Sequence, residues 1–150
     1  MRKLTYKTIL STIVLGAFSL NAFSADKQCM QIGGMGLAEA MDETHLVAAL
    51  SGDMTGANAE ITRQKKTETG LILDMQHHFM SNKNGLLKTK DKATLTTVPG
   101  KDQTYMLEIN YTVVDSKGIY ADYRGEFHSF GLIKLGKGQV ILRYKGEICK

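Results

Sequence analysis

The sequence predicts one all-β domain, a single antiparallel β-barrel of about eight strands. Several segments alternate apolar and polar residues with a period of two, which is typical of strands with one buried face. Short runs rich in glycine, asparagine and serine separate these segments, and 15 glycines stand against one proline. Short connections favour antiparallel neighbours, and a closed barrel leaves no strand edge unpaired.

Four segments show the alternation most clearly, and we expect one face of each to point inward. These faces are Leu71, Leu73, Met75, His77 and Phe79; Leu87, Thr89, Asp91, Ala93 and Leu95; Tyr105, Leu107, Ile109, Tyr111 and Val113; and Val140, Leu142, Tyr144 and Ile148. Two further strands, with weaker alternation, are predicted over 46–54 and 56–63.

The stretch from Gly33 to Thr44 is ambiguous. Leu37, Met41 and His45 fall at helical spacing, which favours a short helix before Thr44. The pattern leaves this helix and a non-helical start equally open.

The first 24 residues have the layout of a secretory signal peptide. Arg2, Lys3 and Lys7 precede the uncharged apolar run Thr8–Leu20, and small residues lead to the expected cleavage site after Ser24. The run is 13 residues long, short of the roughly 18 to 20 needed to span a bilayer. We therefore expect residues 25–150 to form one domain that is periplasmic or secreted, with no transmembrane segment after signal removal.

The two cysteines lie near the two ends of this domain. In an oxidising compartment Cys29 and Cys149 are expected to form a disulfide, for which only one pairing exists. Two free thiols used in metal or redox chemistry are the weaker alternative, because the spacing matches no ligand motif.

Charge gives no indication of a nucleic-acid partner. The formal net charge of +4 falls to +1 once Arg2, Lys3 and Lys7 are removed with the signal. Lys88, Lys90 and Lys92 have the period-two spacing of the solvent face of a strand, without interleaved aromatic residues. We expect no nucleic acid to bind.

Glycine and strand patterns over roughly residues 46–149 resemble small exported barrels related to allene oxide cyclase. The resemblance is carried by His78 and Phe79, Gly85 and Leu86, Thr89 to Asp91, Ala93 and Leu95, and by the stretches 118–125 and 136–149 with Tyr144, Gly146 and Cys149. It implies a barrel with an apolar lumen. In the plant enzyme that lumen holds an oxygenated fatty-acid derivative, but no residue here matches its pocket, so the resemblance bears on fold rather than activity.

His77 and Asp91 form the candidate polar site. A hairpin centred near Asn84 would place them opposite each other on inward faces. As a functional pair they would meet the polar end of a ligand or move a proton. The alternatives are a buried hydrogen bond that fixes strand register, which is the commoner role, or an Asp91 that bulges into water.

Two function classes follow, and a third stays open. The first is a barrel that binds a small apolar ligand with the residues His77, Asp91, Phe79, Tyr105, Tyr111, Phe127 and Tyr144. The second is a structural or protein-interaction module with a filled interior, and the third is a cyclase-type enzyme.

Other chemistry finds little support in the sequence. No Gly-x-Ser-x-Gly elbow is present, and Gly33, Gly34 and Gly36 follow no strand that would make them a phosphate loop. Met30, Met35, Met41, Met54 and His45 are more consistent with core packing than with a soft copper site. We expect no metal and no cofactor.

Overall fold

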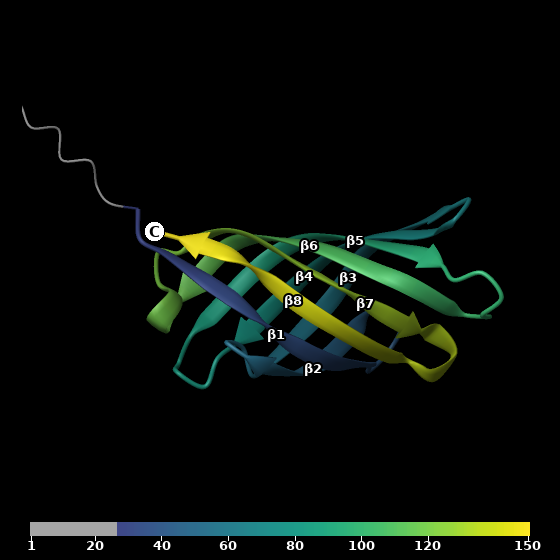
Figure 1. Cartoon of the computed structure of the whole chain (residues 1–150), viewed down its shortest axis with the longest axis horizontal. Helices are drawn as coiled ribbons and strands as arrows, with labels where there is room; N and C mark the ends of the chain where they lie inside the picture. Colours follow the sequence, from purple (N-terminus) through teal and green to yellow (C-terminus); the bar gives the residue numbers. More distant parts are fainter. Residues whose placement is uncertain (1–26) are drawn as a thin grey trace, which may run out of the picture.

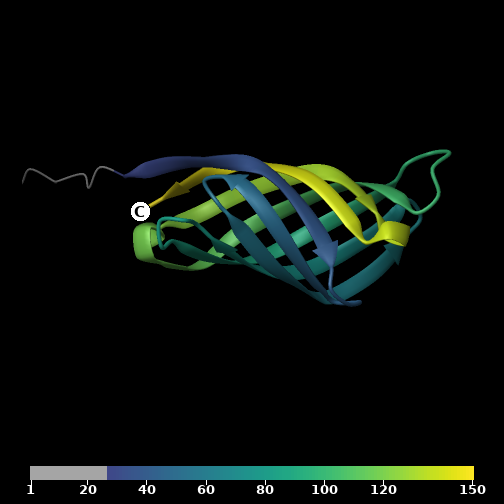
Figure 2. The same ribbon diagram turned by 90° about the horizontal axis from the view of Figure 1, so that it is seen from below.

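Eight antiparallel strands form a closed barrel in the computed structural model, which describes residues 27–150 (Figures 1 and 2). The predicted signal peptide, residues 1–24, lies outside the described residues. The strands are β1 (Cys29–Ala40), β2 (His45–Gly52), β3 (Gly56–Thr67), β4 (Gly70–Met80), β5 (Leu86–Thr97), β6 (Thr104–Lys117), β7 (Arg124–Lys134) and β8 (Gln139–Cys149). The predicted fold class is confirmed.

Pairing between the first and last strands closes the barrel. Their register runs from Cys29 opposite Cys149 to Glu39 opposite Gln139. The predicted disulfide joins the first of these pairs and so locks the two ends of the domain together. A disulfide at this position indicates an oxidising compartment.

Helix is scarce in the described residues. Two short 3-10 turns, η1 (Gly118–Tyr120) and η2 (Leu135–Lys137), are the helical elements between residues 27 and 150. No helix in that range is long and apolar enough to cross a membrane.

The helix considered before Thr44 is wrong, because strand β1 continues to Ala40 and a bend follows it. The inward positions of this strand include Gly34, Gly36 and Ala38, whose small side chains hide the period-two pattern. The larger Leu37 points outward and is 62% exposed. Strand β7 was not predicted from the sequence either, because its inward face contains the small polar residue Ser129, which interrupts the apolar alternation.

The four inward faces predicted from alternation are confirmed, with two members less enclosed than the others. All of these side chains are buried except Leu71 and Tyr105, which lie near strand ends and are half-buried. Lys90 and Lys92 are exposed on the outer face of β5, as expected for the solvent side of a strand.

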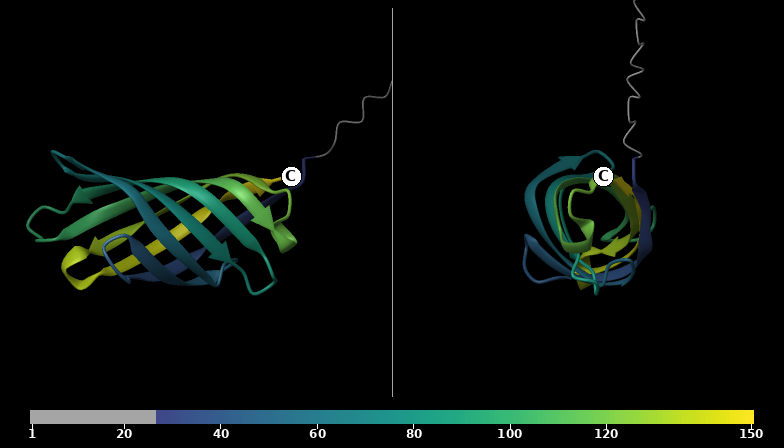
Figure 3. Two further views of the ribbon diagram at one scale, coloured as in Figure 1. Left: turned by 180° about the vertical axis from the view of Figure 1, so that it is seen from behind. Right: turned by 90° about the vertical axis from the view of Figure 1, so that its left-hand side faces the viewer.

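One end of the barrel is closed, and the described part of the chain begins and ends there, with Cys29 paired to Cys149 (Figure 3). Met54, Tyr120 and Tyr123 are buried there. The Tyr144 hydroxyl donates to the Ser51 carbonyl at 3.0 Å and accepts the Met54 N–H at 2.9 Å, which draws the β2–β3 turn across the opening. We call this the closed end, and the opposite one the open end.

Two details keep the closed end in place. Burial raises the pKa of the Tyr144 and Tyr120 phenols, so both stay protonated and act as donors, Tyr120 to the Asp53 carbonyl at 3.1 Å. A Cβ on Gly34 would lie 2.6 Å from the Tyr144 oxygen and overlap the Ser51 carbonyl. Only glycine therefore allows Tyr144 to reach the turn.

Removing the disulfide should destabilise the domain without changing its fold. Cys29 and Cys149 are 120 residues apart, and closing a loop of that length is worth about 5 kcal/mol in the chain-entropy model. In urea unfolding experiments, reduction of the wild type should lower its free energy of unfolding by up to that amount. A Cys29→Ser, Cys149→Ser variant should have the same free energy of unfolding as the reduced wild type. Adding reductant should not change the stability of this variant. Equal stability of oxidised and reduced wild type would contradict this prediction.

Candidate functional site: an apolar cavity in the barrel

Small inward side chains are concentrated on three neighbouring strands. Ala38 of β1 lies opposite Ala48 of β2, which lies opposite Ala57 of β3, so three alanines stand side by side at one level of the barrel. Strands β4 to β8 mostly present larger aliphatic and aromatic residues at inward positions. Because a closed backbone cannot collapse onto missing side chains, this wall leaves unfilled volume.

The unfilled volume is an apolar cavity of about 280 Å³. Its size is close to the lower end of the range for small-molecule sites, roughly 300 to 1,000 Å³. Residues of the β1–β2 and β7–β8 turns, Asp42, Glu43, Leu135 and Gly138, belong to its lining and place its mouth at the open end. A small apolar molecule could enter there.

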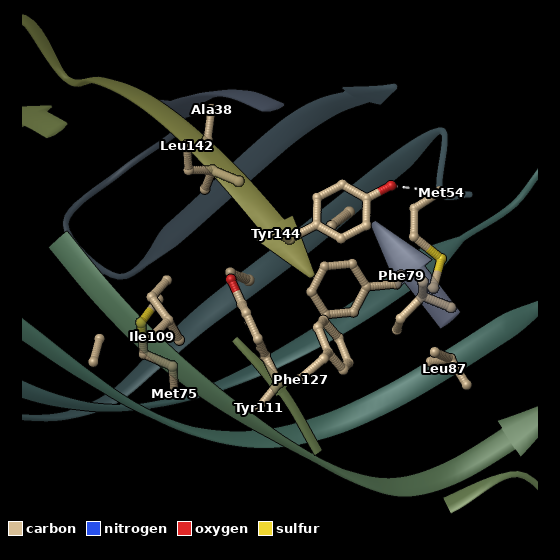
Figure 4. Packing of buried hydrophobic residues seen from close by; sticks show 14 of the residues in the cluster. Ala38, Met54, Met75, Phe79, Leu87, Ile109, Tyr111, Phe127, Leu142 and Tyr144 are labelled. Atoms are coloured by element: carbon tan, nitrogen blue, oxygen red, sulfur yellow. Dashed lines mark hydrogen bonds between the residues drawn. The ribbon is translucent and has the colours of Figure 1, made fainter. Parts of the chain in front are cut away.

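Aromatic rings fill the barrel between the cavity and the closed end (Figure 4). Tyr111 stacks on Phe127 with ring centroids 4.5 Å apart, and Phe79 meets both rings edge-on at 5.2 and 5.3 Å. Such offset and edge-to-face contacts stabilise the cluster beyond simple burial. The cluster is the floor of the cavity.

Of the five aromatic residues predicted to bind a ligand, some line the cavity and others do not. Phe79, Tyr111 and Tyr144 line the cavity. Phe127 is buried in the aromatic cluster and is not part of the lining. Tyr105 packs against the edge of the core and does not line the cavity either.

His77 and Asp91 are in contact, as expected, although the predicted register is off by two residues. His77 lies opposite Thr89, and Asp91 lies opposite Met75. A shift of two keeps both side chains on the inward face, and His77 Nδ1 reaches Asp91 Oδ2 diagonally at 2.7 Å. The Ser81 hydroxyl accepts N–H groups from Lys83 and Gly85 and so shapes the turn that sets this register.

The pair is buried, and its two members are placed differently. The Asp91 side chain is 0% exposed, whereas the His77 side chain is 11% exposed and borders the cavity. Within residues 27–150, Asp91 Oδ1 and the neighbouring inward hydroxyl of Thr89 have no hydrogen-bond partner. The carboxylate thus depends on the imidazole for its stabilisation.

Tyr111 adds a neutral polar group to the floor. Its hydroxyl lies 2.7 Å from the Ser129 hydroxyl, and burial raises the pKa of the phenol, so the ring carries no charge. The other polar side chains in contact at the floor are His77 and Asp91.

The mouth of the cavity is acidic. Asp42 accepts the backbone N–H groups of Thr44 and His45 at 2.7 Å each. These hydrogen bonds, with one from the His45 ring, hold the pKa of Asp42 well below its usual range, so the carboxyl is ionised at any ordinary pH. With Glu43 it places two carboxylates in the lining of the entrance, and the β7–β8 turn at the same mouth carries Lys137.

Side chains that could hold a metal ion come together at one place in residues 27–150. The one group of potential ligands between residues 27 and 150 consists of Cys29, Glu147 and Cys149, and both sulfurs are consumed by the disulfide. The methionines considered for copper are dispersed, with Met54 buried at the closed end and Met35 and Met41 exposed.

No family model, curated protein or solved structure matches the chain. The eight-stranded barrel implied by the resemblance to allene oxide cyclase relatives is present. Membership of that family has no support from these comparisons.

The outer surface has one row of apolar side chains. Leu37, Ile141, Leu132 and Met106 lie directly opposite one another across β1, β8, β7 and β6. All four are exposed. Sequence reasoning missed this row, because it depends on registers that only the closed barrel establishes.

The alanine wall was also missed, although a signal for it exists. Glycine or alanine occupies every second position from Gly34 to Ala40, and again at Ala57 and Ala59. A period-two pattern of very small residues in a barrel indicates a wall that leaves space.

Substitution by a larger side chain should affect stability differently at the two ends of the barrel. An Ala48→Leu side chain would extend into the cavity, so we expect urea unfolding to show wild-type stability or better. In Gly146→Ala, the added Cβ would lie 2.4 Å from Phe127 Cβ and should cost about 1 to 3 kcal/mol through overpacking. A larger loss for Ala48→Leu than for Gly146→Ala would show that the cavity is not free space.

Proposed function

We propose that the barrel binds a small, uncharged, mainly apolar molecule in this cavity, with one hydrogen-bonding group of the ligand directed at His77. The observation that carries the proposal is a cavity of about 280 Å³ whose apolar lining contains one imidazole at its floor. Pockets of this kind obtain affinity from apolar contact and orientation from a few polar groups.

The ring nitrogens of His77 differ in their availability. Nδ1 is committed to Asp91, so Nε2 is the atom that can meet a ligand. With the proton on Nδ1, a neutral imidazole accepts a hydrogen bond at Nε2. A ligand hydroxyl is the matching donor, while the rest of the ligand would contact Phe79, Tyr111, Tyr144 and the alanine wall.

Electrostatics favour a neutral ligand over a fatty acid. A carboxylate would pass the ionised Asp42 and Glu43 at the mouth and then approach the buried Asp91 at the floor. Like charges at both places raise the cost of binding, most strongly where water is excluded. The structure therefore supports an alcohol-like ligand rather than the acid.

A protein-interaction role is the alternative. The aromatic cluster that fills the closed half of the barrel favours it, because only part of the interior is free. If no small molecule binds, this function takes its place, and the exposed row Leu37, Ile141, Leu132 and Met106 becomes the first surface to test.

Octanol should bind more tightly than octanoate, as measured by isothermal titration calorimetry. A His77→Phe, Asp91→Leu variant removes both polar groups at once and leaves no buried charge unpaired. It should lose about 1 to 3 kcal/mol of octanol affinity and keep its affinity for toluene, which forms no hydrogen bond. Ala48→Leu should weaken all three ligands by occupying the cavity.

Two results would count against the proposal. Absence of binding for both octanol and toluene would reject the cavity as a ligand site. Octanoate binding more tightly than octanol would reject the neutral ligand class.

We further infer that the domain works outside the cytoplasm, as the disulfide and the predicted signal peptide suggest together. Intact mass of the protein from a periplasmic or secreted fraction should correspond to a chain starting near Ala25. Thiol alkylation without reductant should add no mass. An intact N-terminus, or two alkylated cysteines, would contradict the inference.

A further inference from the structure

The polar pair at the cavity floor has the arrangement of a catalytic base and its orienting carboxylate. Nδ1 of His77 is 2.7 Å from Asp91 Oδ2, and the ring borders a cavity in which a substrate would lie. A base with one ring nitrogen bonded to a carboxylate and the other directed at the substrate is a recurring geometry in acid–base catalysis.

Asp91 is suited to hold the ring in its basic form. Its hydrogen bond places the proton on Nδ1 and leaves the Nε2 lone pair free. Its side chain is 0% exposed, and its second oxygen has no partner within residues 27–150. The carboxylate therefore acts mainly on His77 and would stabilise the imidazolium formed when Nε2 takes a proton.

Neighbouring rings fix the orientation of the imidazole. His77 is stacked on Phe79 at 5.3 Å with an interplanar angle of 12°, and it meets Tyr111 edge-on at 5.1 Å. Contacts on a face and an edge, added to the hydrogen bond, prevent the ring from turning away from the cavity. The lining of the cavity around the ring is mainly apolar, and charge interactions are stronger in such surroundings than in water.

Few charged or titratable groups compete with this pair. Asp91 faces His77 from β5 and Tyr111 faces it from β6, while its β3 neighbour opposite is Ala59. Burial raises the pKa of the Tyr111 phenol, so that ring stays neutral. Asp42 and Glu43 are at the mouth of the cavity.

We propose that this cavity is a proton-transfer site in which His77 is the general base toward a C–H bond of a small, uncharged, largely apolar substrate. Asp91 is a positioning residue. The proposal rests on the binding function proposed above and adds a reaction class to it, namely isomerisation or elimination.

The step balances without an oxidant or a cofactor. Nε2 forms a bond to the proton as the C–H bond breaks, and the C–H electron pair becomes a new π bond of the substrate. In an elimination, the electron pair of the bond to the leaving group departs with that group. In an isomerisation, the electron pair of an adjacent π bond of the substrate shifts to the far atom of that bond, which then receives the proton back from Nε2.

Base-catalysed opening of nitrobenzisoxazole tests this directly, because the probe is small, flat and uncharged. Removal of its ring C–H proton breaks the N–O bond and yields a nitrile and a coloured phenolate. We expect saturable turnover above the buffer rate. His77→Gln, whose amide can still donate to Asp91, should lower kcat/KM roughly 100-fold or more.

Asp91→Asn separates positioning from binding. It should lower kcat roughly tenfold or more. Affinity for the 3-methyl derivative of the probe, an uncharged and unreactive analogue that lacks the labile ring proton, should stay within about threefold of wild type. Melting curves on both variants establish that they are folded.

The outcomes of this experiment and of the octanol titration are distinguishable. If the analogue binds but turnover is absent or unchanged in His77→Gln, the general-base role is overturned and ligand binding stands. Failure of the analogue to bind also overturns it, because the proposed site must accept a small flat apolar ring. The octanol and toluene titrations decide the binding function independently.

Discussion

The width of a closed eight-stranded barrel is set by its backbone, so the sizes of the inward side chains decide whether the interior is full. This constraint governs the whole molecule. Along β4 to β8 large residues fill the space, and along β1 to β3 Ala38, Ala48 and Ala57 leave it open. The cavity is the direct consequence of this uneven distribution.

The closed end turns that space into a pocket with one mouth. Tyr144 ties the β2–β3 turn across the opening, and the aromatic cluster around Phe79 separates the cavity from it. A ligand would thus enter past Asp42 and come to rest against His77. The order of acidic residues at the mouth, an apolar wall and a polar floor is the basis for proposing a neutral ligand with one hydrogen-bonding group.

The two cysteines and the expected export to an oxidising compartment predicted the disulfide. Alternation of residues, with the turn residues between segments, predicted the barrel and the inward placement of His77 and Asp91. It failed where inward residues are very small, as along β1, since hydrophobicity carries no signal in glycine and alanine. It also placed the β4–β5 register two residues away, because the shape of the turn after Met80 depends on hydrogen bonds of Ser81. The cavity and the outer apolar row require the closed geometry, in which residues distant in sequence become neighbours.

Alanine methyl spectra recorded during an octanol titration would test the central claim most directly. Ala48 points into the cavity, while its neighbour Ala49 is exposed on the outer face of the same strand. If the ligand occupies the cavity, the methyl signals of Ala38, Ala48 and Ala57 will shift together and that of Ala49 will stay in place. Shifts confined to Ala49 and the outer row, or no shift in the three wall alanines at saturating octanol, would contradict the account.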